Sequence, residues 1–118
     1  MREEERATLE RAAARLRAFD WYPRPVRVRR VRSVVVPWLF RLPWFRNFDG
    51  YATHFVLLFR DRASATDEDL VTHELCHVWQ MQHRPLSMPL SFLTRGYEQN
   101  PYEEEARRAD ELTRADLD

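Results

Sequence analysis

The sequence predicts an α+β fold, with helices at both ends of the chain and a small sheet of about three strands between them. Three observations lead to this expectation. Residues 3–18 repeat apolar side chains at helical steps, residues 26–36 and 51–59 are rich in apolar and β-branched side chains, and two further helical patterns follow residue 66. This order of helix, strands and helices is typical of a small α+β domain.

The N-terminal helix is expected over residues 3–18, where Leu9, Ala12 and Leu16 recur on one face and prolines after Trp21 stop the pattern. Two short strands or one bent strand should follow over residues 26–36. An irregular aromatic segment then leads to a turn at Asp49-Gly50 and a strand over residues 51–59 that contains His54.

The second half should open with a connector over residues 61–65. Thr66 is then expected to cap a helix over residues 67–82, because acidic residues follow it in the first turn. Two prolines predict a loop over residues 84–90, with a short helical turn at 91–94. Asn100-Pro101 is a typical helix start, so a last helix should extend to about Arg114.

Composition limits the class of protein. With 118 residues, 44% of them hydrophobic, the chain supports a single domain over residues 1–118, since neither half could bury a good core alone. The one cysteine, Cys76, excludes an internal disulfide and a zinc site built from cysteines, and we expect it to be a small buried residue. No apolar run is long enough for a membrane span or a secretory signal, so we expect a cytoplasmic protein.

The charges are unevenly distributed. Residues 1–60 carry 13 Arg and 6 acidic residues, a net +7, whereas residues 61–118 carry 6 Arg and 13 acidic residues, a net −7. The two halves should therefore attract each other on folding. The zero net charge disfavours a chain held on nucleic acid by charge alone.

The segment Trp21–Phe48 contains seven Arg, seven aromatic residues and no acid. Such a mixture can bind single-stranded nucleic acid or lie peripherally on an anionic membrane. We favour the simpler interpretation, in which the aromatic side chains join the core and the Arg side chains pair with the acidic second half.

The segment His73-Glu74-Leu75-Cys76-His77 contains the pattern His-Glu-x-x-His within the predicted helix. Residues four apart lie on the same helix face, so His73 and His77 can bind one zinc ion. Glu74 is then placed to take the proton of the metal-activated water. The residues therefore predict a Zn²⁺ site whose ligands include His73 and His77, with Glu74 as general base.

Such a site needs a third protein ligand. His83 has the spacing of a third histidine, but a continuous helix would carry it roughly 9 Å from His77 along the axis. In the last helix, Ala106 and Ala109 mark the buried face, Glu103 and Glu105 flank it, and Glu104 points away. We favour Glu103 as the third ligand, with Glu105 as the alternative.

The residues His73-Glu74-Leu75-Cys76-His77-Val78-Trp79-Gln80 and Asn100-Pro101-Tyr102-Glu103-Glu104-Glu105-Ala106 together resemble the gluzincin division of zincin metallopeptidases, especially its very small members, the minigluzincins. The resemblance covers roughly residues 45–112. It implies a peptidase that uses His73, His77 and Glu103 as zinc ligands and Glu74 as general base, with a substrate-lining strand within residues 51–59.

Two positions depart from that family. Arg107 stands where many members carry an Asp, and no histidine follows His83 to stabilise an oxyanion. Tyr97, Tyr102 and His54 are the candidates for the latter role, although His54 is better explained as a structural residue.

The sequence thus predicts a zinc-dependent peptidase-like domain acting on a peptide or protein substrate bound in extended form. The alternative is a non-catalytic, zinc-stabilised interaction domain that uses the Arg and aromatic surface. Nucleic acid is not expected as a partner.

Overall fold

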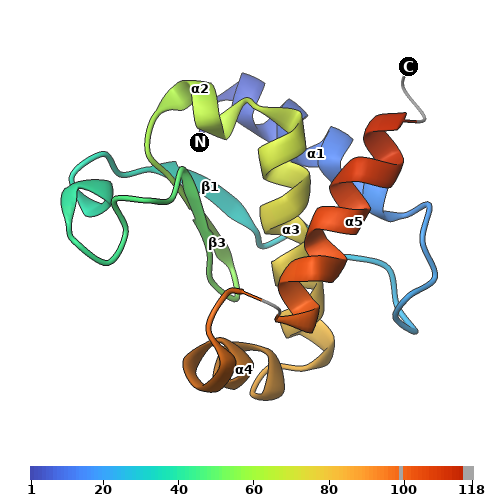
Figure 1. Ribbon diagram of the computed structural model, residues 1–118. Coiled ribbons are helices and arrows are strands. Elements are labelled where there is room, and N and C mark those ends of the chain that lie inside the picture. Colours follow the sequence, from blue (N-terminus) through green and yellow to red (C-terminus); the bar gives the residue numbers. More distant parts are fainter. Residues whose placement is uncertain (99, 116–118) are drawn as a thin grey trace.

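The computed structural model describes residues 1–98 and 100–115, and it has the α+β architecture that the sequence predicts (Figure 1). A mixed sheet lies beside the long central helix α3, and α1 and α5 pack against that helix. The elements in chain order are α1 (Glu3–Leu16), β1 (Arg32–Val35), the short 3₁₀ helix η1 (Leu39–Arg41), β2 (Gly50–Ala52), β3 (Val56–Phe59), α2 (Arg62–Ala65), α3 (Glu68–His83), α4 (Ser87–Arg95) and α5 (Pro101–Ala115).

The sheet has the order β1-β3-β2, with β1 parallel and β2 antiparallel to the central strand β3. The prediction of one strand over residues 51–59 was wrong, because the chain turns back at Thr53. The Thr53 hydroxyl donates to the carbonyl of Val56 and accepts from its amide, which closes a tight hairpin. His54 lies in this turn and not within a strand.

Two further expectations for the first half were wrong. Asp49-Gly50 is not a turn, since Gly50 begins β2 and the Asp49 carbonyl accepts from the Arg60 amide. Residues 26–29 do not form a strand, although Val26 is buried. The Val31 amide bonds to the Val28 carbonyl, so the chain turns there before β1 begins.

Helix α3 occupies the centre of the core. Leu9, Ala12 and Leu16 of α1 are fully buried against it, which confirms the predicted face of that helix. Ala106 and Ala109 of α5 are also fully buried, as predicted. Small alanines at these positions let the α5 backbone approach α3 closely. This approach brings Glu103 of α5 next to His73 and His77 of α3.

The segment 61–65, predicted as a connector, forms the short helix α2, whose N-cap Asp61 accepts from the Ser64 amide. Thr66 ends α2 and does not cap α3. Asp67 takes that role, and its carboxylate accepts from the amides of Asp69 and Leu70. The first residue of α3 is therefore set by the Asp67 carboxylate, which lies at the helix N-terminus, where the helix dipole favours negative charge.

Helix α4 takes up residues 87–90 of the loop predicted over residues 84–90 and continues through the turn predicted at 91–94 to Arg95. Pro89 is tolerated because it lies in the first helical turn, where a backbone N–H has no intrahelical partner. The helix ends at Gly96, whose φ of 73° lies in the left-handed region that favours glycine.

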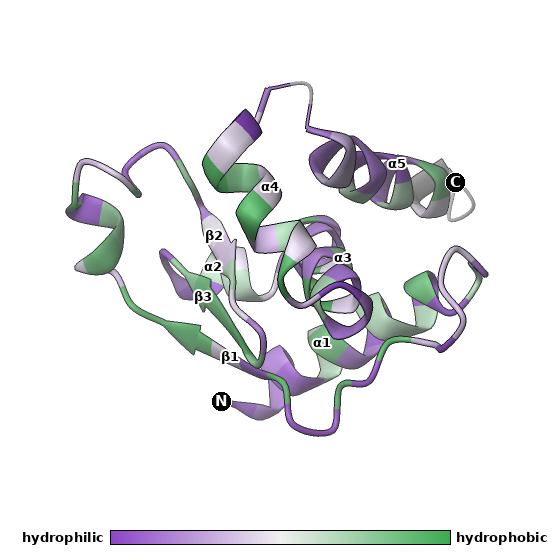
Figure 2. Cartoon of the chain, turned by 90° about the horizontal axis from the view of Figure 1, so that it is seen from below, coloured by the Kyte–Doolittle hydropathy of each residue, from purple (hydrophilic) through white to green (hydrophobic). Residues whose placement is uncertain are grey.

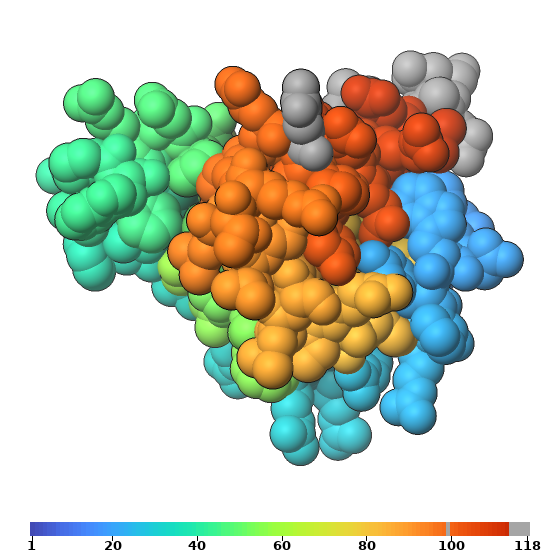
Figure 3. Space-filling model, turned by 60° about the horizontal axis from the view of Figure 1, so that its bottom comes forward, coloured from blue at the N-terminus to red at the C-terminus, as the bar shows by residue number. Residues whose placement is uncertain are grey.

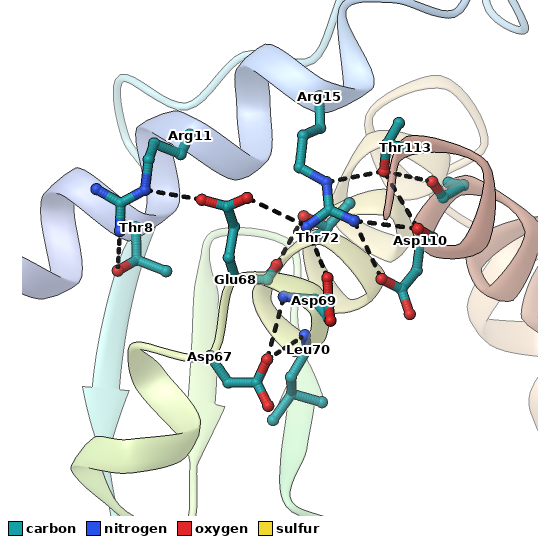
Figure 4. A network of polar contacts seen from close by, with 11 residues as sticks. Thr8, Arg11, Arg15, Asp67, Glu68, Asp69, Leu70, Thr72, Asp110 and Thr113 are labelled. Atoms are coloured by element: carbon teal, nitrogen blue, oxygen red, sulfur yellow. Dashed lines mark hydrogen bonds and ion pairs between the residues drawn. The ribbon is translucent and has the colours of Figure 1, made fainter. Parts of the chain in front are cut away.

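The attraction predicted between the two halves is centred on Arg15, which is buried between α1, α3 and α5 (Figure 4). Its guanidinium pairs with Glu68 at 3.3 Å, Asp69 at 3.0 Å and Asp110 at 3.1 Å, and its Nε donates to the Thr113 hydroxyl at 2.8 Å. One arginine from the basic half thus joins two helices of the acidic half.

No helix within the described residues has the length and apolarity needed to cross a membrane.

Candidate metal centre

The two histidines of α3 and one glutamate of α5 meet at the side of the central helix. Nε2 of His73 lies 2.7 Å from Oε1 of Glu103, and Nε2 of His77 lies 2.9 Å from Oε2 of the same carboxylate. His77 is buried, whereas His73 and Glu103 are partly exposed. The structure therefore brings together the three residues predicted as ligands from spacing and helix periodicity.

This donor set fits zinc in its chemistry and spacing. Two imidazole nitrogens and one carboxylate oxygen are ligands typical of catalytic zinc, which keeps a fourth position open. Their ligand atoms lie within 4.8 Å of one another.

The charges of His77 and Glu103 shift each other's pKa values in opposite directions. Burial alone would lower the pKa of His77, but its hydrogen bond with Glu103 and the negative charges of Glu74 and Glu103 raise it overall. Burial would likewise raise the pKa of Glu103, yet the hydrogen bonds from both histidines hold it well below the usual range. Glu103 is therefore a carboxylate, the form in which it can bind a cation.

Glu74 lies next to this cluster and is 8% exposed. Within the described part of the chain its carboxylate makes no hydrogen bond, and burial raises its pKa, with the two histidines partly offsetting that effect. Strand β2 closes over it: a Cβ on Gly50 would lie 3.2 Å from Cγ of Glu74 and 3.1 Å from the Phe59 ring. Glycine at this position thus allows the sheet to approach the buried acid.

The orientation of His77 is set by Gln80, one turn further along α3. The fully buried Gln80 amide donates through Nε2 to the Tyr102 carbonyl at 2.8 Å and to Glu105 at 3.1 Å. Because both partners only accept, the other amide atom must be the oxygen, and it accepts from Nδ1–H of His77 at 2.8 Å. His77 thus donates from both ring nitrogens, to Gln80 and to Glu103, and when Nε2 loses its proton its lone pair is the one directed into the site.

A further residue supports this chain of hydrogen bonds from the N-terminal half. The Tyr22 hydroxyl donates to Glu105 at 2.6 Å, and burial together with the Glu105 charge raises the pKa of Tyr22 strongly, so the hydroxyl keeps its proton. Sequence reasoning missed Gln80 and Tyr22. Gln80 had a usable signal, since it lies three residues after His77 on the same helix face, but Tyr22 is 83 residues from its partner.

A cavity of about 560 Å³ opens beside the metal ligands. Glu74, His77 and Glu103 form part of its wall, and apolar side chains form most of the rest. Phe92 of α4 packs edge-on against His77, with ring centroids 5.5 Å apart. The remaining lining residues come from residues 44–52, α3, α4 and the segment after it: Trp44, Phe45, Phe48, Gly50, Tyr51, Ala52, Met81, Met88, Pro89, Leu93 and Tyr97.

The alternative ligands lie elsewhere. His83 is at the end of the unbroken helix α3, where Nε2 accepts from the Arg24 amide and Nδ1 contacts the Trp79 carbonyl. Glu105 is held by Tyr22 and Gln80 and is not part of the His73, His77 and Glu103 group. Cys76 is fully buried in the core, as predicted.

The three candidates for oxyanion stabilisation are also separated. His54 is exposed and its Nε2 lies 3.1 Å from the Pro85 carbonyl, whereas Tyr102 takes part through its carbonyl bonded to Gln80. Tyr97 lines the cavity. Burial and the neighbouring Tyr51, Glu74 and Glu103 raise the pKa of Tyr97, so its hydroxyl stays protonated and can donate a hydrogen bond.

The Arg and aromatic segment 21–48 matches the favoured interpretation only in part. Tyr22 packs edge-on against the buried Trp79 with centroids 5.0 Å apart, and Phe40 is buried. Trp38 and Trp44 are 64% and 78% exposed, however, and within residues 1–98 and 100–115 none of the seven arginines is in an ion pair. The expected pairing of these arginines with the acidic half was wrong.

Comparisons of this chain with protein-family models, with curated proteins and with solved structures give no match.

Proposed function

We propose that this chain is a zinc-dependent peptidase of gluzincin type, with His73, His77 and Glu103 as the metal ligands and Glu74 as the general base. The observation that carries the proposal is the convergence of three metal-ligating atoms from two helices beside a buried carboxylate that has no hydrogen-bond partner among the described residues. Glu74 lines the cavity, so its carboxylate is left to interact with a group bound there and not with the rest of the described protein.

Zinc bound in such a site supplies a Lewis acid that lowers the pKa of a coordinated water and polarises a carbonyl. Gln80 keeps Nε2 of His77 directed into the site, and the Glu103 carboxylate balances the charge of the cation. Glu74 accepts a proton from the attacking water and returns it to the leaving amine, a task suited to a carboxyl whose pKa is raised by burial. Tyr97 donates a hydrogen bond to the oxygen on which negative charge develops.

The cavity supports a peptide substrate with a large apolar side chain next to the bond that is cut, because its lining is rich in aromatic and methionine side chains. Strand β2 is an edge of the sheet, bonded to β3 on one side only within the described chain. An extended substrate can add to that edge through main-chain hydrogen bonds.

Metal content tests the ligand set. The chain purified without added metal should hold about one zinc, and Glu103→Ala should lose it. Glu104→Ala is the matched control, since Glu104 is an exposed neighbour on the same helix. Glu105→Ala and His83→Ala test the two alternative ligands. Loss of zinc on His83→Ala with retention on Glu103→Ala would overturn the assignment.

Hydrolysis tests the catalytic role. Glu74→Gln preserves the shape of the side chain and should retain zinc while peptide cleavage falls by at least about a hundredfold. A quenched fluorescent peptide library, with large apolar residues at varied positions, provides the substrates. Zinc bound by the wild type without cleavage of any library member would instead favour the non-catalytic, zinc-stabilised interaction domain.

A further inference from the structure

Helix α4 carries apolar side chains on two faces. Met88 and Phe92 face the cavity, whereas Leu90, Leu93 at the cavity edge, and Leu86 just before the helix are 56%, 84% and 80% exposed. These three leucines are spaced by four and three residues, so they form one outward stripe along the helix. A surface helix normally directs polar residues outward, and this stripe therefore calls for a partner.

The stripe continues onto the segment 37–48. Trp44 and Leu93 both line the cavity, so the two segments meet at its mouth. Figure 3 shows the green segment 37–48 beside the orange α4 on one face of the molecule, and Figure 2 shows apolar residues on both. Trp38 and Trp44 protrude from this segment, at 64% and 78% exposure.

The two segments carry charge of one sign, and the acids nearest to them in the chain are Asp49 and Glu98. Residues 37–48 contain Arg41 and Arg46, residues 84–96 contain Arg84 and Arg95, and neither segment contains an acidic residue. All four arginines are exposed, and none forms an ion pair within the described part of the chain. The face therefore combines protruding Trp and Leu side chains with uncompensated positive charge.

We infer that segment 37–48 and helix α4 form a docking surface for an anionic lipid bilayer. Tryptophan and leucine side chains next to arginines are the composition of surfaces that lie at the boundary between headgroups and acyl chains. The side chains project from two separate segments, and fluid lipid can surround them without a matching set of pockets. With this face on a membrane, the mouth of the cavity lies at the lipid interface.

Vesicle co-sedimentation tests this surface. The protein should pellet with vesicles of phosphatidylcholine and phosphatidylglycerol at low salt, and much less with pure phosphatidylcholine or at 0.5 M salt. Leu86→Ser with Leu90→Ser should weaken binding about tenfold or more, and Arg84→Gln with Arg95→Gln should do the same. None of these four residues lines the cavity or belongs to the metal site.

Matched controls lie on α5. Leu112→Ser removes an exposed leucine there, and Arg107→Gln with Arg108→Gln removes two exposed arginines, so both should leave vesicle binding unchanged. Each variant is measured with zinc and with a chelator, and binding under both conditions separates this surface from the proposed peptidase.

Three outcomes would overturn the inference. The first is absence of binding to anionic vesicles, and the second is equal binding to neutral ones. The third is a concentration-dependent dimer in solution that the paired leucine substitutions abolish, which would assign the stripe to a second copy of this chain.

Discussion

Replacing Gln80 by leucine tests how the metal site is held in place. Gln80 is fully buried, and its amide bonds to Nδ1 of His77, to the Tyr102 carbonyl and to Glu105. Leucine has a similar size but no polar atoms, so Gln80→Leu leaves Nδ1–H of His77 without a partner, whereas the Tyr102 carbonyl keeps the amide four residues on in α5. Glu105 keeps the Tyr22 hydroxyl as a donor.

Two magnitudes follow. Loss of the residue that orients a metal-bound histidine weakens metal binding about 10- to 100-fold. In the metal-free protein, Nδ1–H of His77 loses its partner at about 1–3 kcal/mol, the lost bonds to Tyr102 and Glu105 add to this cost, and the added apolar contact offsets part of it. We expect a net destabilisation of about 2 kcal/mol, which lowers the unfolding temperature by about 8 °C for a chain of 118 residues.

The assay is competition for zinc against a chromophoric chelator at pH 7, together with thermal unfolding of the metal-free protein. Gln82→Leu is the matched control, since Gln82 lies on the same helix and bonds to the Arg27 backbone, away from the metal ligands. The reasoning fails if Gln80→Leu binds zinc like the wild type, or if Gln82→Leu weakens zinc binding equally.

Three further predictions concern the core, the sheet and the cavity. Arg15→Met removes three ion pairs of a side chain that is 7% exposed, so the unfolding temperature should fall by about 8 °C. The control Arg11→Met removes one ion pair of an exposed side chain and should leave the unfolding temperature almost unchanged. Gly50→Val places side-chain atoms against Glu74, so peptide cleavage should decrease while the zinc content stays unchanged. Unchanged cleavage would show that β2 can shift to accommodate the added side chain. Tyr97→Phe should lower kcat about 100-fold with little change in KM, whereas a change in KM alone would assign Tyr97 to substrate binding.

The features that the sequence predicts well are those fixed by local patterns. The faces of α1 and α5 follow from helical periodicity, and the start of α5 follows from Asn100, whose side chain accepts from the Tyr102 amide. The angle between neighbouring residues on a helix and the position of two alanines placed Glu103 and Glu105 beside the buried face and Glu104 away from it, but did not separate Glu103 from Glu105. Each of these signals lies within about one turn of the residue it predicts.

The features that the sequence predicts poorly depend on partners far along the chain. The two prolines after Arg84 predict a loop. A helix forms there instead, and its residues Met88 and Phe92 line the cavity. The hairpin within residues 51–59 depends on one threonine hydroxyl, whereas the run of apolar residues around it is equally compatible with a single strand. Hydrophobic periodicity cannot distinguish one long strand from a short hairpin when the residues on both sides of the turn are apolar.

The departure at Arg107 now has a physical explanation. Many members of the family that this chain resembles place an acid at that position, but here the residue is an exposed arginine. In this chain the hydrogen bond that orients His77, a proposed metal ligand, comes from Gln80, which is held by Glu105 and, through it, by Tyr22. Tyr22 lies outside residues 45–112, the part of the chain that the family resemblance covers. The segment that contains Tyr22 is therefore tied to the metal site by hydrogen bonds, and removing it should weaken zinc binding as well as the fold.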